Sequence, residues 1–418
     1  MLDIKLIRNN LEEVRTGLLK RIPADKFDLE KIISLDDQRR DLIQQGEELK
    51  AERNKYSKTK PTPEIITQMK GVGEKIKALD ERLLTIETEL NDRIAELPNL
   101  PAADVMAGDK ENNEVIYTHG RQPKFKFTPR DHVELATSLG LVDYERAAKM
   151  SGAGFWCYKG EGALLEWALL SYFIDFHTKN GYQFLIPPFL LTEKSAYTSG
   201  QLPKFRDDLF WTQDKLCLNA TSEMMLGNYH RDEILNEVDL PLKYFAYSPC
   251  FRREAGSYRQ EERGMIRGHQ FNKIEMFIFT HPNKTWEMFA ELTNQAQKLM
   301  EQLGLHFQVS KLAAGDCSAA MAKTYDIEVY IPSMGIYKEV SSISNALEYQ
   351  ARRGQIRYRD KETDKNEFVH TLNASGLATS RLLPAILEQN QQADGSIVIP
   401  KVLRPYLPKR MKIIKKKD

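Results

Sequence analysis

The chain has 418 residues, of which 28% are charged, and a net charge of +1. This length accommodates two domains, and the balanced charge means that nucleic acid could be bound only where basic residues cluster. The four cysteines form no Cys-x-x-Cys pair, so neither a zinc ribbon nor a disulfide framework is indicated, and reduced thiols in the cytoplasm are expected. No apolar run is long enough to span a membrane, and the first residues lack the apolar core of a signal peptide.

A helical hairpin is predicted between about residues 27 and 97, after a short helix within residues 1–23. Its second half carries apolar residues at alternating steps of four and three: Ile65, Met69, Val72, Ile76, Leu79, Leu83, Ile86 and Leu90. Its first half repeats every seven residues: Leu35, Leu42, Leu49 and Tyr56. Such repeats are typical of a coiled-coil seam, and the prolines between the halves separate two helices. We therefore predict an antiparallel pair whose second helix has about 34 residues and a length of ~50 Å.

Basic side chains crowd the outer half of this hairpin, whose tip is expected near residues 58–64. They are Arg39, Arg40, Lys50, Arg53, Lys55, Lys58, Lys60, Lys70 and Lys75. A basic surface of this kind suits the phosphates of a nucleic acid, although acidic residues are interspersed. A solvated coil that serves dimerisation is the other interpretation, and the pattern alone leaves it open.

A domain boundary is predicted after residue 103, which divides the chain into residues 1–103 and 104–418. A polar linker follows the boundary, and the next elements are helices that begin near residues 131 and 144. A long apolar helix over residues 162–179 then leads to a strand that ends in proline. Proline fits at a strand end because it has no N–H to donate to a neighbouring strand.

The stretch 250–275 predicts a strand, a polar loop at 257–264 and a second strand. The second strand shows apolar residues at period two: Ile274, Met276 and Ile278. Arg252 and Glu254 leave the first strand, and Phe271 enters the second. An arginine fork can hold a phosphate in two hydrogen bonds, and an aromatic ring can stack on a base. The stretch therefore suits a nucleotide, although a short Arg-x-Glu alone would also fit a surface hairpin.

Thr221 and Glu223 follow a short apolar strand at residues 216–218. In an extended segment, side chains two positions apart point to one face, where these two could hold an ammonium group. A helix N-cap with glutamate in the first turn is the alternative interpretation.

Two more strands are predicted at residues 323–330 and 337–342, where carboxylates on a buried sheet near a triphosphate can hold Mg²⁺. A glycine-bearing segment, 372–381, then leads into a helix with Arg381 at the junction. The chain has neither a P-loop nor the glycine pattern of a dinucleotide fold, so an ATP site would have to be of another kind.

These segments resemble the three motifs of class II aminoacyl-tRNA synthetases in their usual order. Residues 162–188 resemble motif 1, residues 250–275 motif 2, and residues 372–381 motif 3. The Arg-x-His-Gln-Phe-x-Lys-Ile-Glu run that ends at Glu275 is most similar to seryl-tRNA synthetases, which also carry an N-terminal helical hairpin. Alanine at 374 and serine at 380 replace glycines of the family pattern, which predicts a more crowded site.

The resemblance implies an α+β fold, with a mixed, mostly antiparallel sheet flanked by helices and an N-terminal coiled-coil arm. It implies a homodimer that ligates L-serine to serine tRNA through a seryl-adenylate, with ATP as substrate and Mg²⁺ as cofactor. The long variable arm of the tRNA would lie against the coiled coil of residues 27–97. Charging of selenocysteine tRNA with serine is also implied, in hosts that have this tRNA. The alternatives are a carrier-protein aminoacyl ligase and a paralogue that binds RNA without catalysis.

The same resemblance assigns roles to individual residues, with Arg252 and Arg381 as the catalytic pair. ATP would be bound by Arg252, Arg253, Glu254, Phe271, Glu339, Val340, Ser341, Ser342 and Arg381. Serine would be bound by Thr221, Ser222, Glu223, Arg252, Glu275 and Ser375. Magnesium would be held by Glu339 and Ser342.

Overall fold

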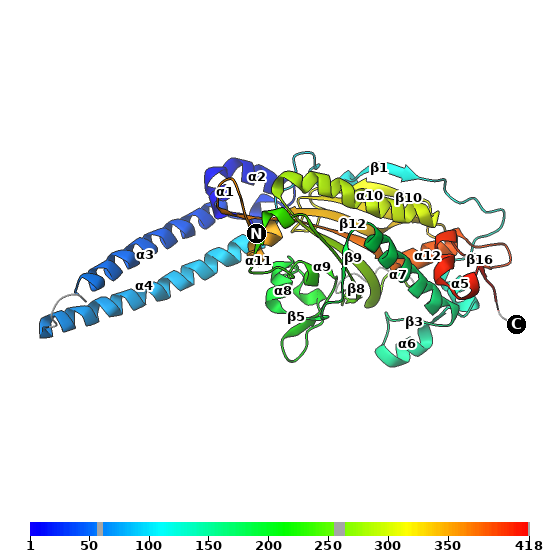
Figure 1. Cartoon of the computed structure of the whole chain (residues 1–418), viewed down its shortest axis with the longest axis horizontal. Coiled ribbons are helices and arrows are strands. Elements are labelled where there is room, and N and C mark those ends of the chain that lie inside the picture. Colours follow the sequence, from blue (N-terminus) through cyan, green and yellow to red (C-terminus); the bar gives the residue numbers. More distant parts are fainter. Residues whose placement is uncertain (57–61, 255–263, 417–418) are drawn as a thin grey trace. The chain divides into compact units, whose positions relative to one another are not determined.

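The structure is a computed structural model that describes residues 1–56, 62–254 and 264–416. The chain divides into two compact units, Met1–Leu100 and Pro101–Asp418 (Figure 1). Much of the predicted hairpin tip at residues 58–64, with Lys58 and Lys60, lies outside the described residues, as does most of the polar loop at 257–264.

In the described residues of the first unit, the regular secondary structure is helical. Its α-helices are α1 (Ile4–Asn9), α2 (Leu11–Leu19), α3 (Leu29–Tyr56) and α4 (Pro63–Glu96). The prediction of one short helix within residues 1–23 is wrong, because Asn10 leaves the helical region with φ −128° and ψ 43° and separates α1 from α2. The prediction for the second arm helix is confirmed, since α4 has 34 residues and begins where the Thr62 hydroxyl accepts the N–H of Ile65.

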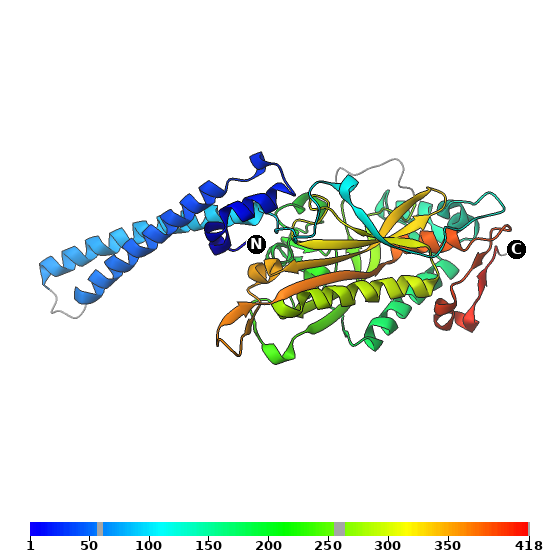
Figure 2. The ribbon, with the colours of Figure 1, turned by 90° about the horizontal axis from the view of Figure 1, so that it is seen from above.

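Helices α3 and α4 lie side by side along their length (Figure 2). All eight apolar positions predicted for the seam of α4 are buried or half-buried, and Val72, Ile76 and Leu90 are fully buried. On α3, Leu35 and Leu42 are buried, whereas Arg53, at the intervening seam position between Leu49 and Tyr56, is exposed. The seam predicted from the spacing is therefore confirmed, with polar interruptions.

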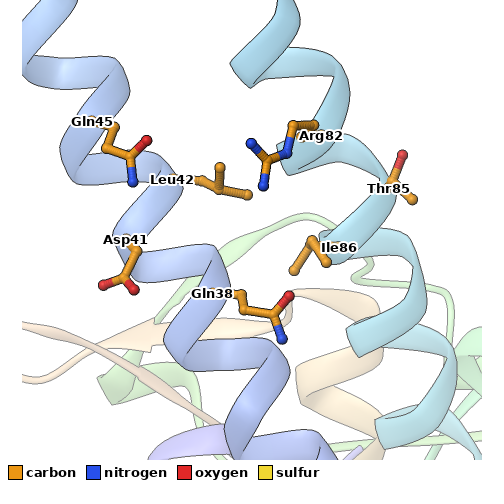
Figure 3. Close-up of a pocket in the computed structure, with 7 residues that line it drawn as sticks. All are labelled: Gln38, Asp41, Leu42, Gln45, Arg82, Thr85 and Ile86. Atoms are coloured by element: carbon orange, nitrogen blue, oxygen red, sulfur yellow. The ribbon is translucent and has the colours of Figure 1, made fainter.

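A groove of about 360 Å³ lies between the two arm helices (Figure 3). Its lining residues are Gln38, Asp41, Leu42, Gln45, Arg82, Thr85 and Ile86. Leu42 and Ile86 point into the space between the helices, and the other side chains around them are polar. The arm is thus held by a thin apolar seam rather than by a thick core.

The second unit is built on an eight-stranded sheet. Its order is β1 (Glu114–His119), β10 (Phe307–Lys311), β11 (Lys323–Ile331), β12 (Ile336–Leu347), β15 (His370–Ala378), β9 (Gln270–Thr280), β8 (Leu242–Phe251) and β4 (Gln183–Leu185). Neighbouring strands are antiparallel except β4 and β8, which are parallel. The predicted mixed, mostly antiparallel sheet is confirmed, as are the strands expected on both sides of the polar loop.

The two faces of this sheet are covered differently. One face packs against the long helices α7 (Glu161–Lys179), α10 (Thr285–Leu303) and α12 (Thr379–Gln389), and its β9 residues are Ile274, Met276 and Ile278. Figure 2 shows α10 lying along the sheet. The other face carries Phe277 and Phe279, which pack near the short helices α9 (Glu223–Leu226) and α11 (Tyr349–Gly354). Because β9 side chains alternate, Phe271, Lys273 and Glu275 belong to this second face.

Smaller elements surround the sheet. The helices are α5 (His132–Ser138), α6 (Tyr144–Ser151) and α8 (Glu193–Thr198). The strands are β2 (Val142–Asp143), β3 (Cys157–Tyr158), β5 (Leu190–Thr192), β6 (Leu216–Leu218), β7 (Ile234–Asn236), β13 (Arg357–Arg359), β14 (Asn366–Phe368), β16 (Ile397–Val398) and β17 (Ile413–Ile414). The helices predicted near residues 131 and 144 match α5 and α6, and Asp131 starts α5 by accepting two backbone N–H groups.

In the part of the chain that the structure describes, no helix has both the length and the apolar character needed to cross a membrane. The four cysteines are free thiols: Cys157, Cys217, Cys250 and Cys317.

Candidate active site

A polar cavity lies on the sheet face that carries Phe271 and Lys273. Strands β9, β12 and β15, the first turn of α12 and the segments 252–254 and 266–268 supply its lining. The lining residues are Arg252, Glu254, Ile266, Arg267, Gly268, Phe271, Lys273, Glu339, Val340, Ser375, Ala378, Ser380 and Arg381. The cavity therefore gathers the Arg-x-Glu stretch, the strand that follows it and the glycine-bearing segment, which are far apart in the sequence.

Two arginines face this cavity from different segments. Arg381, in the first turn of α12, donates from Nη1 to the carbonyl oxygen of Glu339 at 2.8 Å and lies 3.3 Å from its Oε2. Arg252 follows directly after β8, and its guanidinium lies 5.2 Å from the centre of the Phe271 ring. Two guanidinium groups around one cavity can hold adjacent phosphates, and the Phe271 ring lines the same cavity beside Arg252.

The residues after Arg252 turn sharply away from the strand. Glu254 has a positive φ of 51°, a left-handed conformation that side-chain-bearing residues seldom adopt. Its carboxylate is held by Arg267, which donates from Nε at 2.8 Å and from Nη2 at 2.6 Å. Arg253 is exposed, and its backbone N–H donates to Asp208 O at 2.9 Å. Glu254 is thus fixed at the cavity edge, whereas the Arg253 side chain points to solvent.

A buried lysine connects two of the predicted serine-binding residues. Lys273 is 5% exposed and donates from Nζ to the hydroxyl of Thr221 at 2.6 Å. It also forms an ion pair with Glu275, whose side chain is equally buried. Thr221 Oγ1 lies 3.4 Å from Glu275 Oε2, so the three side chains form one polar cluster. Ser375, opposite Glu275 in the strand register, adjoins this cluster.

Two side-chain amides donate hydrogen bonds to the carboxylate of Glu223. Its Oε1 accepts from Nε2 of Gln350 at 2.6 Å and from Nδ2 of Asn373 at 2.9 Å. Burial raises the pKa of Glu223 to about 7, with a further contribution from the negative charge of Glu275. A positively charged group bound next to Glu223 would stabilise its ionised form and lower its pKa again.

The interpretation of residues 221–223 as an extended segment is wrong. Ser222 adopts a helical conformation and Glu223 begins α9, so the helix-start alternative applies. The Thr221 hydroxyl accepts the backbone N–H of Glu223 at 3.3 Å, while the Ser222 hydroxyl bonds to Ser248 at 2.7 Å. Thr221 and Glu223 still reach the same region, because the tight turn brings their side chains together.

Oxygen atoms suited to a divalent cation meet where β11 pairs with β12. Asp326 lies opposite Ser342 in the register, and its buried Oδ1 has no hydrogen-bond partner among the described residues. Burial and the nearby charge of Glu339 raise the pKa of Asp326 well above its usual value. For Glu339, burial also acts to raise the pKa, but Arg381, Arg252 and Lys273 outweigh it and the pKa is lowered.

This donor set fits a magnesium ion that also takes oxygens from phosphate and water. No group of three or more His, Cys, Asp or Glu side chains placed for a metal ion occurs in residues 1–56, 62–254 and 264–416. Magnesium typically uses one or two carboxylates and completes its shell with substrate oxygens. A site of Glu339, Ser342 and Asp326 is of that kind.

Comparisons with known proteins agree with this geometry. Residues 1–101 match the family model of the seryl-tRNA synthetase N-terminal domain, and residues 205–390 match that of the tRNA synthetase class II core domain (G, H, P, S and T). Serine–tRNA ligase 2 of Clostridium acetobutylicum is 53% identical over 98% of this chain and 99% of its own length.

The chain belongs to the serine–tRNA ligase family. The serine–tRNA ligase of Geobacter sulfurreducens is 46% identical over 99% of this chain and 100% of its own length. The seryl-tRNA synthetase of Pyrococcus horikoshii, solved in complex with ATP, superposes with a TM-score of 0.93 at 33% identity and covers 100% of both chains. The resemblance inferred from the motifs is thereby confirmed.

Within this serine–tRNA ligase fold, the structure adds four residues to those predicted for the site: Lys273, Asp326, Gln350 and Asn373. Period-two spacing is a signal that could have found two of them, since Lys273 lies between Phe271 and Glu275, and Asn373 lies two positions before Ser375. Gln350 and Asp326 join the site through helix packing and strand register, for which a single sequence carries no comparable signal.

The two replaced glycines have different surroundings. Ala374 is completely buried in the core on the helix-covered face, so its methyl group does not line the cavity. Ser380 does line the cavity, beside Arg381. The expected crowding of the site therefore concerns position 380 rather than position 374.

Proposed function

We propose that this chain is an enzyme that ligates L-serine to serine tRNA through a seryl-adenylate. The observation that carries the proposal is the adjacency, on one sheet face, of an arginine-lined cavity and a buried acidic cluster. The cavity holds Arg252 and Arg381, and the cluster holds Thr221, Glu223 and Glu275. Membership of the serine–tRNA ligase family and the ATP complex of a similar structure support the same proposal.

In the first step, a carboxylate oxygen of serine attacks the α-phosphorus of ATP, and pyrophosphate leaves. Glu223 and Glu275 would bind the serine ammonium group, with Thr221 and Ser375 beside them and Ser222 bracing the turn. Arg252 would meet the α-phosphate and the serine carboxylate. This orientation brings nucleophile and phosphorus together without a covalent enzyme intermediate.

The leaving pyrophosphate carries charge that the second arginine is placed to bind. Arg381 would hold the terminal phosphate, and its present contact with Glu339 would give way to that phosphate. Phe271 would stack on adenine, with Glu254, Val340 and Ser341 close to the nucleotide and Arg253 at its outer edge. Donors placed in advance where charge develops are worth ~3 kcal/mol each in typical enzymes.

Magnesium fits the oxygens of Glu339 and Ser342, and we add Asp326 to this set. When bound, it supplies charge neutralisation to the phosphate oxygens. The protein's oxygen ligands would fix the position of the ion. The pKa of Glu339 is lowered, so its carboxylate is ionised over the physiological pH range.

In the second step, a terminal ribose hydroxyl of the tRNA attacks the carbonyl carbon of the adenylate and AMP leaves. The helical unit would bind the tRNA, and its exposed basic residues include Arg53, Lys70 and Lys75. We also propose a homodimer in the cytoplasm, with the arm of one subunit serving the site of the other. Selenocysteine tRNA would be a further acceptor where the host has it.

The decisive experiment measures ATP–pyrophosphate exchange with each amino acid in turn, followed by transfer to tRNA. We expect serine to be activated far above alanine, because a site built to pair a hydroxyl rejects an analogue without it by large factors. Alanine activated as well as serine would contradict the proposal. Transfer to a carrier protein instead of tRNA would indicate the carrier-protein ligase, and RNA binding without exchange would indicate the non-catalytic paralogue.

A further inference from the structure

A buried carboxylate lies on the far side of the sheet from the cavity. Glu166 belongs to α7 and is 2% exposed. Its Oε1 accepts from Nδ2 of Asn272 at 2.8 Å and from Oγ1 of Thr379 at 2.5 Å. Asn272 faces the same way as Ile274, so these contacts are made on the helix-covered face. The proposed chemistry makes no direct use of Glu166.

The two partners of Glu166 are each joined to residues that line the cavity. Asn272 stands between Phe271 and Lys273 on β9. Thr379 is the first residue of α12, two positions before Arg381. Thr379 Oγ1 also lies 3.1 Å from the carbonyl oxygen of Asn272, which closes a triangle of polar contacts. The triangle ties β9 to the turn of α12 that carries the arginine.

The energetics of Glu166 are poorly explained by a purely structural role. Its Oε2 has no partner at normal hydrogen-bond geometry among the described residues, and the buried hydroxyl of Tyr158 is the polar group that acts on it from nearby. Burial raises the pKa of Glu166 to about 7, although its hydrogen bonds act in the other direction. Burying a carboxyl group with an unpaired oxygen destabilises a fold, whereas an apolar residue of similar size would pack there at no such cost.

We propose that Glu166 is a positioning residue for ATP, which holds Arg381 and Phe271 in their relative placement through Thr379 and Asn272. Without the shared acceptor, α12 and β9 are joined only by the direct contact of Thr379 with the Asn272 carbonyl oxygen, and the Arg381 guanidinium shifts relative to the Phe271 ring. The inference rests on the proposed function, since it concerns the same ATP site. Helix α7 would thus influence ATP binding through Glu166, although Glu166 does not line the cavity.

The test compares Glu166→Leu, Glu166→Gln and Thr379→Val in serine-dependent pyrophosphate exchange. We expect Glu166→Leu and Thr379→Val to raise the KM for ATP by at least about tenfold, with the KM for serine changed by less than about threefold. Glu166→Gln should keep a KM for ATP close to that of the wild type, because the glutamine amide oxygen accepts the same two hydrogen bonds. The double variant should be no worse than either single variant, since both remove one link.

The outcomes separate positioning from structure. Variants that melt earlier but keep the wild-type KM for ATP in their folded fraction would overturn the inference, as would equal changes in the KM values for ATP and serine. If Glu166→Leu does not fold, Thr379→Val and Glu166→Gln carry the test. If the wild-type protein exchanges pyrophosphate with no amino acid, the proposed function fails, while calorimetric binding of ATP to the same variants still decides the inference.

Discussion

The outer half of the helical arm, beyond the buried Asp36, and the cavity side of the sheet use charged residues in opposite ways. In the arm, charged side chains such as Arg53 and Lys70 lie in solvent, and the two helices meet along a thin repeating seam. In the sheet unit, Lys273, Glu275 and Glu223 are almost completely buried, and each depends on partners from distant segments. Each substitution in a repeating apolar seam lowers the stability by a small amount. Loss of one member of a buried polar cluster leaves its partners without hydrogen bonds, which costs more.

The largest contrast is expected from removing single arginines. Arg252→Ala or Arg381→Ala should lower the kcat of serine-dependent pyrophosphate exchange by about 100- to 1000-fold, because each removes a donor aimed at phosphate charge. Arg53→Ala, an exposed arginine of the arm, is the matched control and should leave exchange unchanged. Near-wild-type exchange by either cavity variant would remove that arginine from the site.

Shortening the arm should separate the two chemical steps. Replacing residues 50–78 by a short glycine-rich linker removes the outer basic residues except Arg39 and Arg40 and keeps α1, α2 and the inner seam. We expect exchange within about twofold of wild type, because the sheet unit keeps its own core, and a loss of tRNA charging of at least about tenfold, because phosphate contacts are lost.

A charge variant of the full-length arm serves as the control. Arg53→Gln combined with Lys70→Gln and Lys75→Gln should weaken tRNA binding and reduce its salt dependence without altering exchange. If the shortened protein charges serine tRNA normally, the arm is a structural or dimerisation element, and its proposed role in tRNA binding is wrong.

Acidity should weaken serine binding through Glu223. Its pKa of about 7 means that a proton must leave before the carboxylate can pair with the serine ammonium group. The KM for serine should therefore rise by about tenfold per pH unit as the pH falls below 7, and level off above it. Exchange assays between pH 6 and 8 measure this, and Glu223→Gln should flatten the profile. A KM for serine that is constant over this range would contradict the assignment.

The smallest difference between the sheet unit and the arm is expected in the loss of unfolding free energy when one buried apolar side chain is truncated. Ile278→Ala in the sheet core should cost about 2–5 kcal/mol, because the site is completely enclosed. Leu42→Ala should cost less than about 2 kcal/mol, since Leu42 borders the groove between the arm helices and leaves a smaller enclosed void. Hydrogen exchange of each unit in denaturant would compare the two, and an equal loss would show that the arm is packed as tightly as the sheet.

Elements with a local and periodic signal could be predicted from the amino-acid sequence. The heptads of residues 35–90 specify α3 and α4, and the period-two pattern near Ile278 specifies β9, because backbone geometry turns spacing directly into a face. The order of the motifs was also sufficient for the family. Two local predictions failed. One short helix was expected within residues 1–23, where Asn10 separates α1 from α2. At residues 221–223, a helical turn and an extended segment bring the same two side chains together, and the sequence does not distinguish them.

Which buried groups contact one another could not be predicted from the sequence and depends on the tertiary fold. Glu223 accepts from Gln350 and Asn373, which are 127 and 150 positions away along the chain, and Glu166 accepts from Thr379, 213 positions away. Such pairings follow from strand order, register and the packing of α7 and α12, none of which leaves a periodic mark in one sequence. The free energy of a buried charge depends on those partners, so the chemistry of this site is a property of the assembled sheet.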